Sequence, residues 1–141
     1  MKTFMSRAAL AGLLMGVSVL ASAATPAPEG AEVFIVSPED GATVSQQFKV
    51  QFGTKNVALA PAGDATQNTG HHHLLIDAKE IVPAGAVVPT DANHMHFGKA
   101  QTFAEIKLAP GKHTLQLELG DKNHMAFDPP IVSKKITVNV E

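Results

Sequence analysis

The sequence contains no cysteine among its 141 residues. Disulfide bonds are therefore excluded, and so is a lipid attached to an amino-terminal cysteine. A small chain without such cross-links depends on core packing, or on a bound ligand, for its stability.

Aromatic and arginine side chains are also scarce. Tryptophan and tyrosine are absent, and Arg7 is the only arginine. Surfaces that bind sugars or single-stranded nucleic acids rely on aromatic stacking, and phosphate capture favours the guanidinium fork. The composition therefore argues against a function in sugar or nucleic-acid binding and against phosphate capture by arginine.

Beyond residue 20 the chain has no apolar run long enough to cross a membrane. Lys2 and Arg7 precede a shorter apolar run, residues 8–20, which ends at the small residues 21–23 (ASA). This arrangement predicts a signal peptide over residues 1–23, cleaved near Ala23, and export to the periplasm. Removing Lys2 and Arg7 from the 11 basic residues leaves 9 against 13 acidic ones, and a net charge of −4 argues against a nucleic-acid partner.

The rest of the chain is interpreted as a flexible lead-in, residues 24–30, and a single domain, residues 31–141. Apolar and polar residues alternate between Gly- and Pro-bearing turns, and no amphipathic helix is found. We predict an all-β fold, an immunoglobulin-like antiparallel β-sandwich of about seven strands, with a small β-barrel as the alternative. The clearest expected strands are 31–37, 47–53, 70–77, 101–108, 113–120 and 131–140.

Two segments that contain histidine share the pattern D-x-N-H-M-x-F, at residues 91–97 and 121–127. The repeat predicts two similar loops with similar roles. Between them lie the expected strands 101–108 and 113–120, joined by a tight turn as a hairpin. Because the two strands of a hairpin run in opposite directions, the segments before and after it lie at the same end of the sandwich. Both loops are therefore expected at one end, and His113, near the turn of the hairpin, at the other.

Histidines spaced as H-x-H in a strand present two imidazoles on one face. His71 and His73 have this spacing, and His94 and His96 repeat it. Together with His124 they supply enough nitrogen ligands for Zn²⁺, Cu²⁺ or Ni²⁺. We predict a metal site, for copper first and zinc second, at a loop end of the domain; its ligands are His71, His73, His94, His96 and His124.

Methionine and aspartate residues near these histidines bear on the choice of metal. The thioethers of Met95 and Met125 would favour Cu⁺ if they face the site. In an extended backbone they face away from it, because they adjoin ligands. Asp91, Asp121 and Asp128 are expected to orient imidazole N–H groups.

Structural roles are the alternative for the histidines. His113 follows a turn, and we predict that it bonds back to the backbone. His72 shares a face with Leu74 and Ile76, so we predict a packed, hydrogen-bonded core residue and not a ligand. In place of a metal site, the remaining histidines would brace the loops or form a pH-sensitive surface for an envelope protein or small anion.

Four segments together resemble a bacterial family of exported proteins known as a domain of unknown function. They are residues 70–77 (GHHHLLID), 90–99 (TDANHMHFGK), 110–117 (PGKHTLQL) and 120–130 (GDKNHMAFDPP). The resemblance covers nearly the whole chain after residue 23. It implies an exported β-rich domain and no particular reaction.

These observations predict a protein that binds or handles metal and is not an enzyme. No serine or cysteine nucleophile is paired with a histidine, and no organic cofactor is expected. A metal-dependent hydrolase is the enzymatic alternative, with Asp91, Asp121 or Asp128 as base. The expected partner is a metal ion or an envelope protein, and the sequence predicts no oligomeric state.

Overall fold

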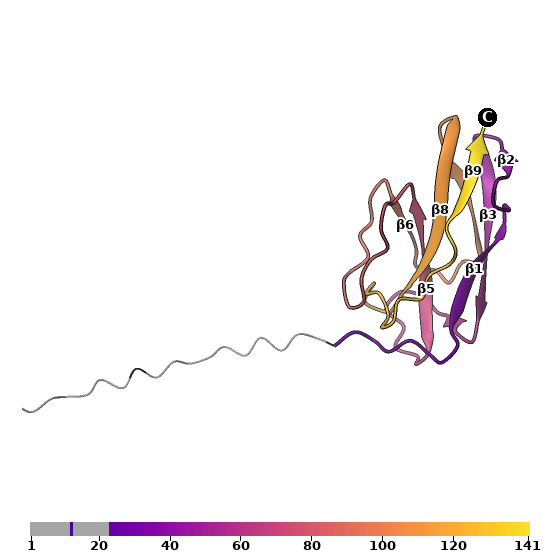
Figure 1. Cartoon of the computed structure of the whole chain (residues 1–141). Helices are drawn as coiled ribbons and strands as arrows, with labels where there is room; N and C mark the ends of the chain where they lie inside the picture. The colour runs from indigo at the N-terminus through magenta and orange to yellow at the C-terminus, as the bar shows by residue number, and fades with distance from the viewer. Residues whose placement is uncertain (1–11, 13–22) are drawn as a thin grey trace, which may run out of the picture.

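Two β-sheets pack face to face in the computed structural model, which describes residue 12 and residues 23–141 (Figure 1). The predicted signal peptide falls almost entirely on residues outside this described part. Strands β1, β3 and β7 form a three-stranded sheet in the order β1-β3-β7. The second sheet has the order β2-β9-β8-β5-β4, and β6 also pairs with β5. The strands are β1 Glu32–Ser37, β2 Thr43–Val44, β3 Gln47–Lys55, β4 Ala58–Leu59, β5 Thr69–Ile76, β6 His94–Phe97, β7 Phe103–Lys107, β8 Gly111–Gly120 and β9 Ile136–Val140.

The architecture confirms the predicted all-β sandwich. Five of the strand pairings are antiparallel, whereas the short pairs β2–β9 and β4–β5 are parallel. Two of the strands that the sequence did not predict, β2 and β4, have only two residues each, too few for a period to be recognised. Within the described residues, no helix has the length and apolarity needed to cross a membrane.

Alternation along the strands produces the core between the sheets. In β3 the side chains of Val50 and Phe52 point inward, while their neighbours Lys49 and Gln51 are exposed. Residues from both sheets meet in this core, which includes Val33, Val50, Phe52, Leu74, Ile76, Phe97, Ile106, Leu115, Leu117, Leu119 and Val138.

Strand β5 is buried on both faces, as predicted for a central strand. Its neighbours are β8 on one side and β4 and β6 on the other. Leu74 and Ile76 belong to the core between the sheets. His71 and His73 have the opposite parity and face away from that core, yet both are 0% exposed. This outer face must therefore be covered by other segments.

The expected hairpin between residues 101–108 and 113–120 is wrong. β7 pairs with β3 in the three-stranded sheet, whereas β8 pairs with β5 and β9 in the other. The turn at residues 109–112 thus crosses from one sheet to the other. A tight turn requires only that two strand ends lie close together, and it does not determine whether those strands share a sheet.

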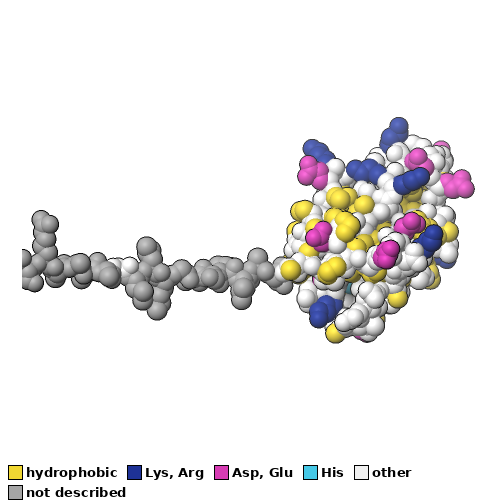
Figure 2. All heavy atoms as spheres, turned by 60° about the horizontal axis from the view of Figure 1, so that its bottom comes forward, with side chains coloured by type: hydrophobic (Ala, Val, Ile, Leu, Met, Phe, Trp, Pro, Cys, Tyr) yellow, Lys and Arg dark blue, Asp and Glu magenta, His cyan; other side chains and the backbone are white. Residues whose placement is uncertain are grey.

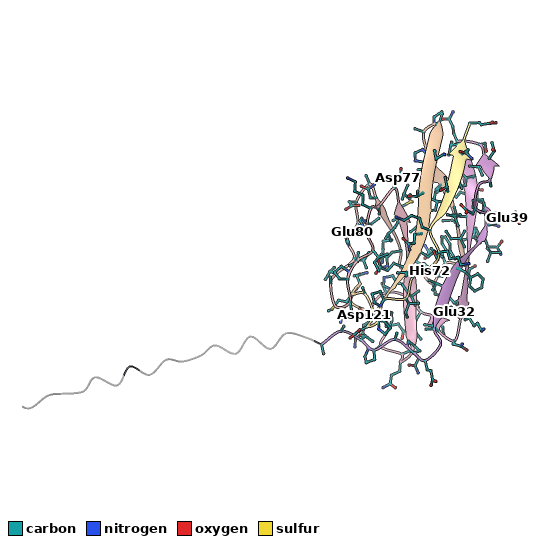
Figure 3. All side chains as sticks on the ribbon, in the orientation of Figure 1. Glu32, Glu39, His72, Asp77, Glu80 and Asp121 are labelled. Carbon is teal, nitrogen blue, oxygen red and sulfur yellow. The ribbon has the colours of Figure 1, made fainter. Side chains whose placement is uncertain are left out.

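The prediction that both D-x-N-H-M-x-F segments lie at one end is also wrong. The first segment contains β6, which runs antiparallel to β5 with His94 opposite Leu75. The second follows Gly120, which is opposite His71 near the other end of β5. Asp77 and Asp121 mark these two ends in Figure 3. The first segment contains a strand as well as a turn, and the strand carries the chain along the sheet before β7 begins.

Candidate metal site

Strands β5 and β6 bring three histidines together on the outer face of the six-stranded sheet, so the predicted position of the site at a loop end of the domain is wrong. His71 and His73 are two positions apart in β5 and therefore share this face. His96 in β6 lies directly opposite His73 in the antiparallel register. The predicted H-x-H pair of β5 is thus completed by one histidine from the neighbouring strand.

The fourth histidine, His124, comes from the turn that follows β8. The Asp121 carboxylate organises this turn, because its Oδ1 accepts the N–H groups of Asn123 at 2.8 Å and Met125 at 3.0 Å. Its Oδ2 accepts the Thr25 hydroxyl at 2.7 Å. The backbone of His124 is left-handed, with φ of 61°. This conformation, held by Asp121, turns the chain so that the His124 ring meets the β5 histidines.

The four imidazoles converge tightly. One ligand nitrogen from each of His71, His73, His96 and His124 lies within 4.8 Å of all the others. A hydrogen bond joins His71 Nε2 to His124 Nδ1 at 3.0 Å. The six ring-centroid distances lie between 4.7 and 6.0 Å. We refer to these four residues as the histidine cluster.

The histidine cluster is buried, and most of its nitrogens lack hydrogen bonds. Little histidine is visible on the face shown in Figure 2. His71 and His73 are fully buried, while His96 and His124 are partly exposed. Among the described residues, no partner is found for His71 Nδ1, for either nitrogen of His73, or for His96 Nε2. Buried polar atoms normally have a partner, and both nitrogens of the core residue His72 lack one in the same described part of the chain, so the convergence of the cluster nitrogens and not their unpaired state alone marks a ligand site.

Two glycines provide the space that the rings occupy. A Cβ atom at Gly120 would lie 2.6 Å from His73 Cε1 and 3.0 Å from His73 Nδ1. A Cβ atom at Gly98 would lie 2.8 Å from His96 Nε2. Real Cβ atoms do not approach so closely, so the absence of side chains at these two positions permits the observed ring positions.

Residues 82–88 cover the outer face together with the turn that carries His124. The N–H of Val88 donates to the His124 carbonyl at 2.7 Å, and Ala126 exchanges backbone hydrogen bonds with Gly85 and Ala86, each of 2.9 Å. Val82, Val88 and Ala126 form a small apolar cluster apart from the main core. We refer to residues 82–88 as the covering segment.

Burial keeps the imidazoles of His71, His73 and His96 neutral at neutral pH. Loss of solvent lowers the pKa of His71 to about 4, and the neighbouring imidazoles of His96 and His124 lower it as well. Burial, followed by the neighbouring imidazoles of His71, His96 and His124, lowers the pKa of His73 to about 3. Burial also lowers the pKa of His96. Neutral imidazole is the form that binds metal, so no proton has to be displaced first.

His94, predicted as a ligand, does not belong to the histidine cluster. It shares a face with His96, but it lies two residues away along β6, opposite Leu75 and not opposite His73. Alternate residues in a strand are about 6.6 Å apart. Its Nδ1 contacts Asp91 Oδ1 at 2.7 Å. The repeated H-x-H spacing gave no means of telling which member of the pair faces the β5 histidines.

The backbone contact predicted for His113 is confirmed, and so is the packing of His72 in the core, but neither ring nitrogen of His72 has the predicted hydrogen-bond partner among the described residues. The His72 ring packs against Phe52, with 5.0 Å between centroids, and burial lowers its pKa to about 4. His113 Nδ1 contacts Asp77 Oδ2 at 2.7 Å, and its Nε2 contacts the Ala109 carbonyl at 2.8 Å. The Asp77 carboxylate raises the pKa of His113.

The structure also places the methionine and aspartate residues for which roles near the metal were predicted. Met95 packs against the core between the sheets, on the face opposite to the histidine cluster. Asp91 contacts His94, and Asp121 holds the turn around His124 through backbone N–H groups. Asp128 is exposed, and its carbonyl accepts the N–H of Ala27.

Sequence reasoning missed Glu118, Gly98 and Gly120. Glu118 is 0% exposed, and burial raises its pKa. The local sequence carried no signal for it, because a glutamate between Leu117 and Leu119 is the ordinary alternation of a strand with one face in the core and predicts that Glu118 faces solvent.

Four imidazoles at these distances match the donor set of a transition-metal ion. Metal–nitrogen bonds of about 2.0–2.1 Å place the nitrogens of a tetrahedral site about 3.3 Å apart. The nitrogens lie up to 4.8 Å apart, so rings at that limit must approach one another by about 1.5 Å to hold an ion. Fold and site together define a β-sandwich with a buried four-histidine cluster on the outer face of one sheet.

The chain belongs to the family described as Domain of unknown function (DUF4399), which matches residues 50–141. This match confirms the resemblance to a domain of unknown function. No curated protein matches the sequence. The chain is similar to a solved structure of CbhA fibronectin(III)-like modules from Clostridium thermocellum, with 13% identity and a TM-score of 0.40, over 77% of this chain and 92% of that one.

Proposed function

We propose that this protein is an exported, periplasmic metal-binding protein that holds one ion in the histidine cluster. The observation that carries the proposal is the convergence of four imidazole nitrogens within 4.8 Å. Two strands and a turn, distant in sequence, contribute these side chains. Their buried nitrogens without hydrogen-bond partners support the same conclusion, because an ion would satisfy several of them at once.

Copper is the first candidate for the ion and zinc the second. All-imidazole donor sets suit Cu²⁺, Zn²⁺ and Ni²⁺, and Cu²⁺ binds most tightly in the general affinity order of these ions. Four protein ligands complete a tetrahedral shell, whereas catalytic zinc sites keep one position for water or substrate. The donor number therefore favours binding or handling of metal over catalysis.

A metal-free histidine network, the basis of an envelope interaction module, is the competing explanation. Such a network is stable when its nitrogens bond to one another. In the histidine cluster the His71–His124 contact at 3.0 Å is the one hydrogen bond between rings, and both nitrogens of His73 lack partners among the described residues. This pattern favours an ion over a bracing network.

Export is supported by the sequence of residues 1–23, with its basic start, apolar run and small-residue end. Mass spectrometry of the protein recovered from a periplasmic fraction would test this part of the proposal. A mature chain that begins at Ala24 is expected, and an uncleaved chain confined to the cytoplasm would contradict it.

Calorimetric titration of Cu²⁺ and Zn²⁺ into tag-free, metal-stripped protein tests the metal site. We expect one ion per chain with submicromolar affinity, typical of specific sites. The variant His71→Ala/His96→Ala/His124→Ala should lose this binding while remaining folded by circular dichroism. His94→Ala is the matched control, because His94 lies outside the histidine cluster, and it should bind like the wild type. Weak binding without defined stoichiometry in the wild type would reject the proposal in favour of the metal-free interaction module.

A further inference from the structure

Glu118 lies beside the histidine cluster on the same face of the sheet. It is directly opposite His73 in the antiparallel pairing of β8 with β5. His96 lies opposite His73 on the other side, so the three residues form a row across β8, β5 and β6. Directly opposed residues have Cβ atoms about 4.5–5.5 Å apart, so Glu118 is an immediate neighbour of a cluster residue.

The two carboxyl oxygens of Glu118 have different surroundings. Oε2 accepts the N–H of Val82 in the covering segment at 2.8 Å. Oε1 is buried and has no hydrogen-bond partner among the described residues. An uncompensated charge in such a place is costly, and a nearby cation would offset that cost.

A cation in the histidine cluster would in turn need a negative charge. Four neutral imidazoles contribute none, and the Asp121 carboxylate, whose negative charge acts on His71, offsets only half of a double positive charge. The carboxylate of Asp121 is committed to Thr25, Asn123 and Met125 through three hydrogen bonds. Glu118 Oε1 therefore remains as a buried carboxylate oxygen with free acceptor capacity beside the site.

Resting on the proposed function, we propose that Glu118 is the charge partner of the bound ion and makes the site select divalent over monovalent cations. Glu118 lies beside His73 and acts on the ion through its charge, without being a ligand. Because Coulomb energy is proportional to the charge of the ion, the carboxylate stabilises a divalent ion about twice as much as a monovalent one. Met95, whose soft thioether would favour Cu⁺, lies on the other face of β6.

The test compares Zn²⁺ with Ag⁺, a monovalent probe that undergoes no redox change, in wild-type protein and in Glu118→Gln. Glutamine keeps the shape of the side chain and an oxygen for the Val82 N–H. Loss of a residue that supports metal ligands typically lowers affinity about 10–100-fold, and we expect this loss for Zn²⁺. For Ag⁺ the loss should be about 3–10-fold, the square root of the Zn²⁺ factor. Chloride-free buffer keeps Ag⁺ in solution.

Glu105→Gln is the matched control, because it makes the same chemical change at an exposed position in β7 of the other sheet. If Glu118→Gln does not fold, Glu118→Leu removes the charge from a side chain of similar size, and the same ratio is expected. Equal losses for Zn²⁺ and Ag⁺, or unchanged Zn²⁺ affinity, would overturn the role of Glu118 and leave the metal site intact. Absence of Zn²⁺ and Cu²⁺ binding in the wild type would overturn the proposed function itself, and this inference with it.

Discussion

Single residues without side chains position the imidazoles of the histidine cluster. At Gly120, a methyl group would meet the His73 ring, and Gly120 is buried with no room to move outward. Gly53, on the outer side of the other sheet, faces a similar restriction, but from the exposed ring of Phe34. The difference between the two glycines is that the exposed Phe34 ring can move away from an added methyl group, whereas the buried His73 ring cannot.

Gly120→Ala is expected to displace the His73 ring and weaken Zn²⁺ binding. Overpacking of this kind costs about 1–3 kcal/mol of unfolding free energy. Gly53→Ala, the control, should leave metal affinity unchanged because the exposed Phe34 ring can rotate away. Chemical denaturation and Zn²⁺ titration of both variants would measure the two effects. Wild-type affinity in a folded Gly120→Ala variant would contradict the positioning role.

At the scale of elements, the two D-x-N-H-M-x-F segments form the same turn with different outcomes. Asp91 Oδ1 accepts the N–H of Asn93, and Asp121 Oδ1 accepts the N–H of Asn123, each at 2.8 Å. After the first turn the chain enters β6, whereas after the second it adopts a left-handed residue at His124. Only the second turn delivers its N-H-M histidine to the histidine cluster.

This difference predicts unequal effects for equivalent substitutions. Asp121→Ala removes three hydrogen bonds from the turn that carries His124, so it should lower both stability and metal affinity. A net hydrogen bond contributes about 0.5–1.5 kcal/mol, or more when the acceptor is charged. Asp91→Ala should lower stability without changing metal affinity. Thermal unfolding and Zn²⁺ titration of both variants would check this, and equal loss of affinity in the two would refute it.

The sequence predicted those elements whose pattern is local. Period-two alternation was sufficient for β1, β3 and β8, and apolar residues on both faces predicted β5 as a central strand. The pair His71 and His73 followed from strand geometry alone. Which histidine of β6 joins them depends on register, and the location of the second turn depends on which sheet each strand enters. Such non-local choices are set by packing across the sandwich, which leaves no periodic signal.

At the scale of the whole molecule, burial of neutral histidines makes the stability of the metal-free protein depend on pH. The pKa values of His71 and His72 fall from 6.5 to about 4 on folding. Between these values an unfolded chain binds protons that the native chain does not. The stabilisation from neutral burial is therefore complete above pH 6.5 and declines as the pH falls toward 4.

We expect the unfolding free energy of metal-free protein to decrease steadily from pH 7 to pH 4.5. Urea denaturation across this range measures it, and NMR titration of the imidazole C–H signals identifies the groups. His113, whose pKa is raised by Asp77, serves as an internal comparison and should already be protonated when His71 and His72 are neutral. Native signals of His71 and His72 that titrate near pH 6.5 would contradict this expectation.

The distance along the chain between the clustered histidines has a consequence for a protein without cysteine. His71 and His124 are 53 positions apart, yet their rings touch. An ion bound by both, and by His96 between them, would close two loops in the chain. Closing loops of this size restricts the unfolded ensemble in the way that a disulfide does. Metal would thus serve as this chain's reversible cross-link, one that a chelator opens and that needs no oxidant to form.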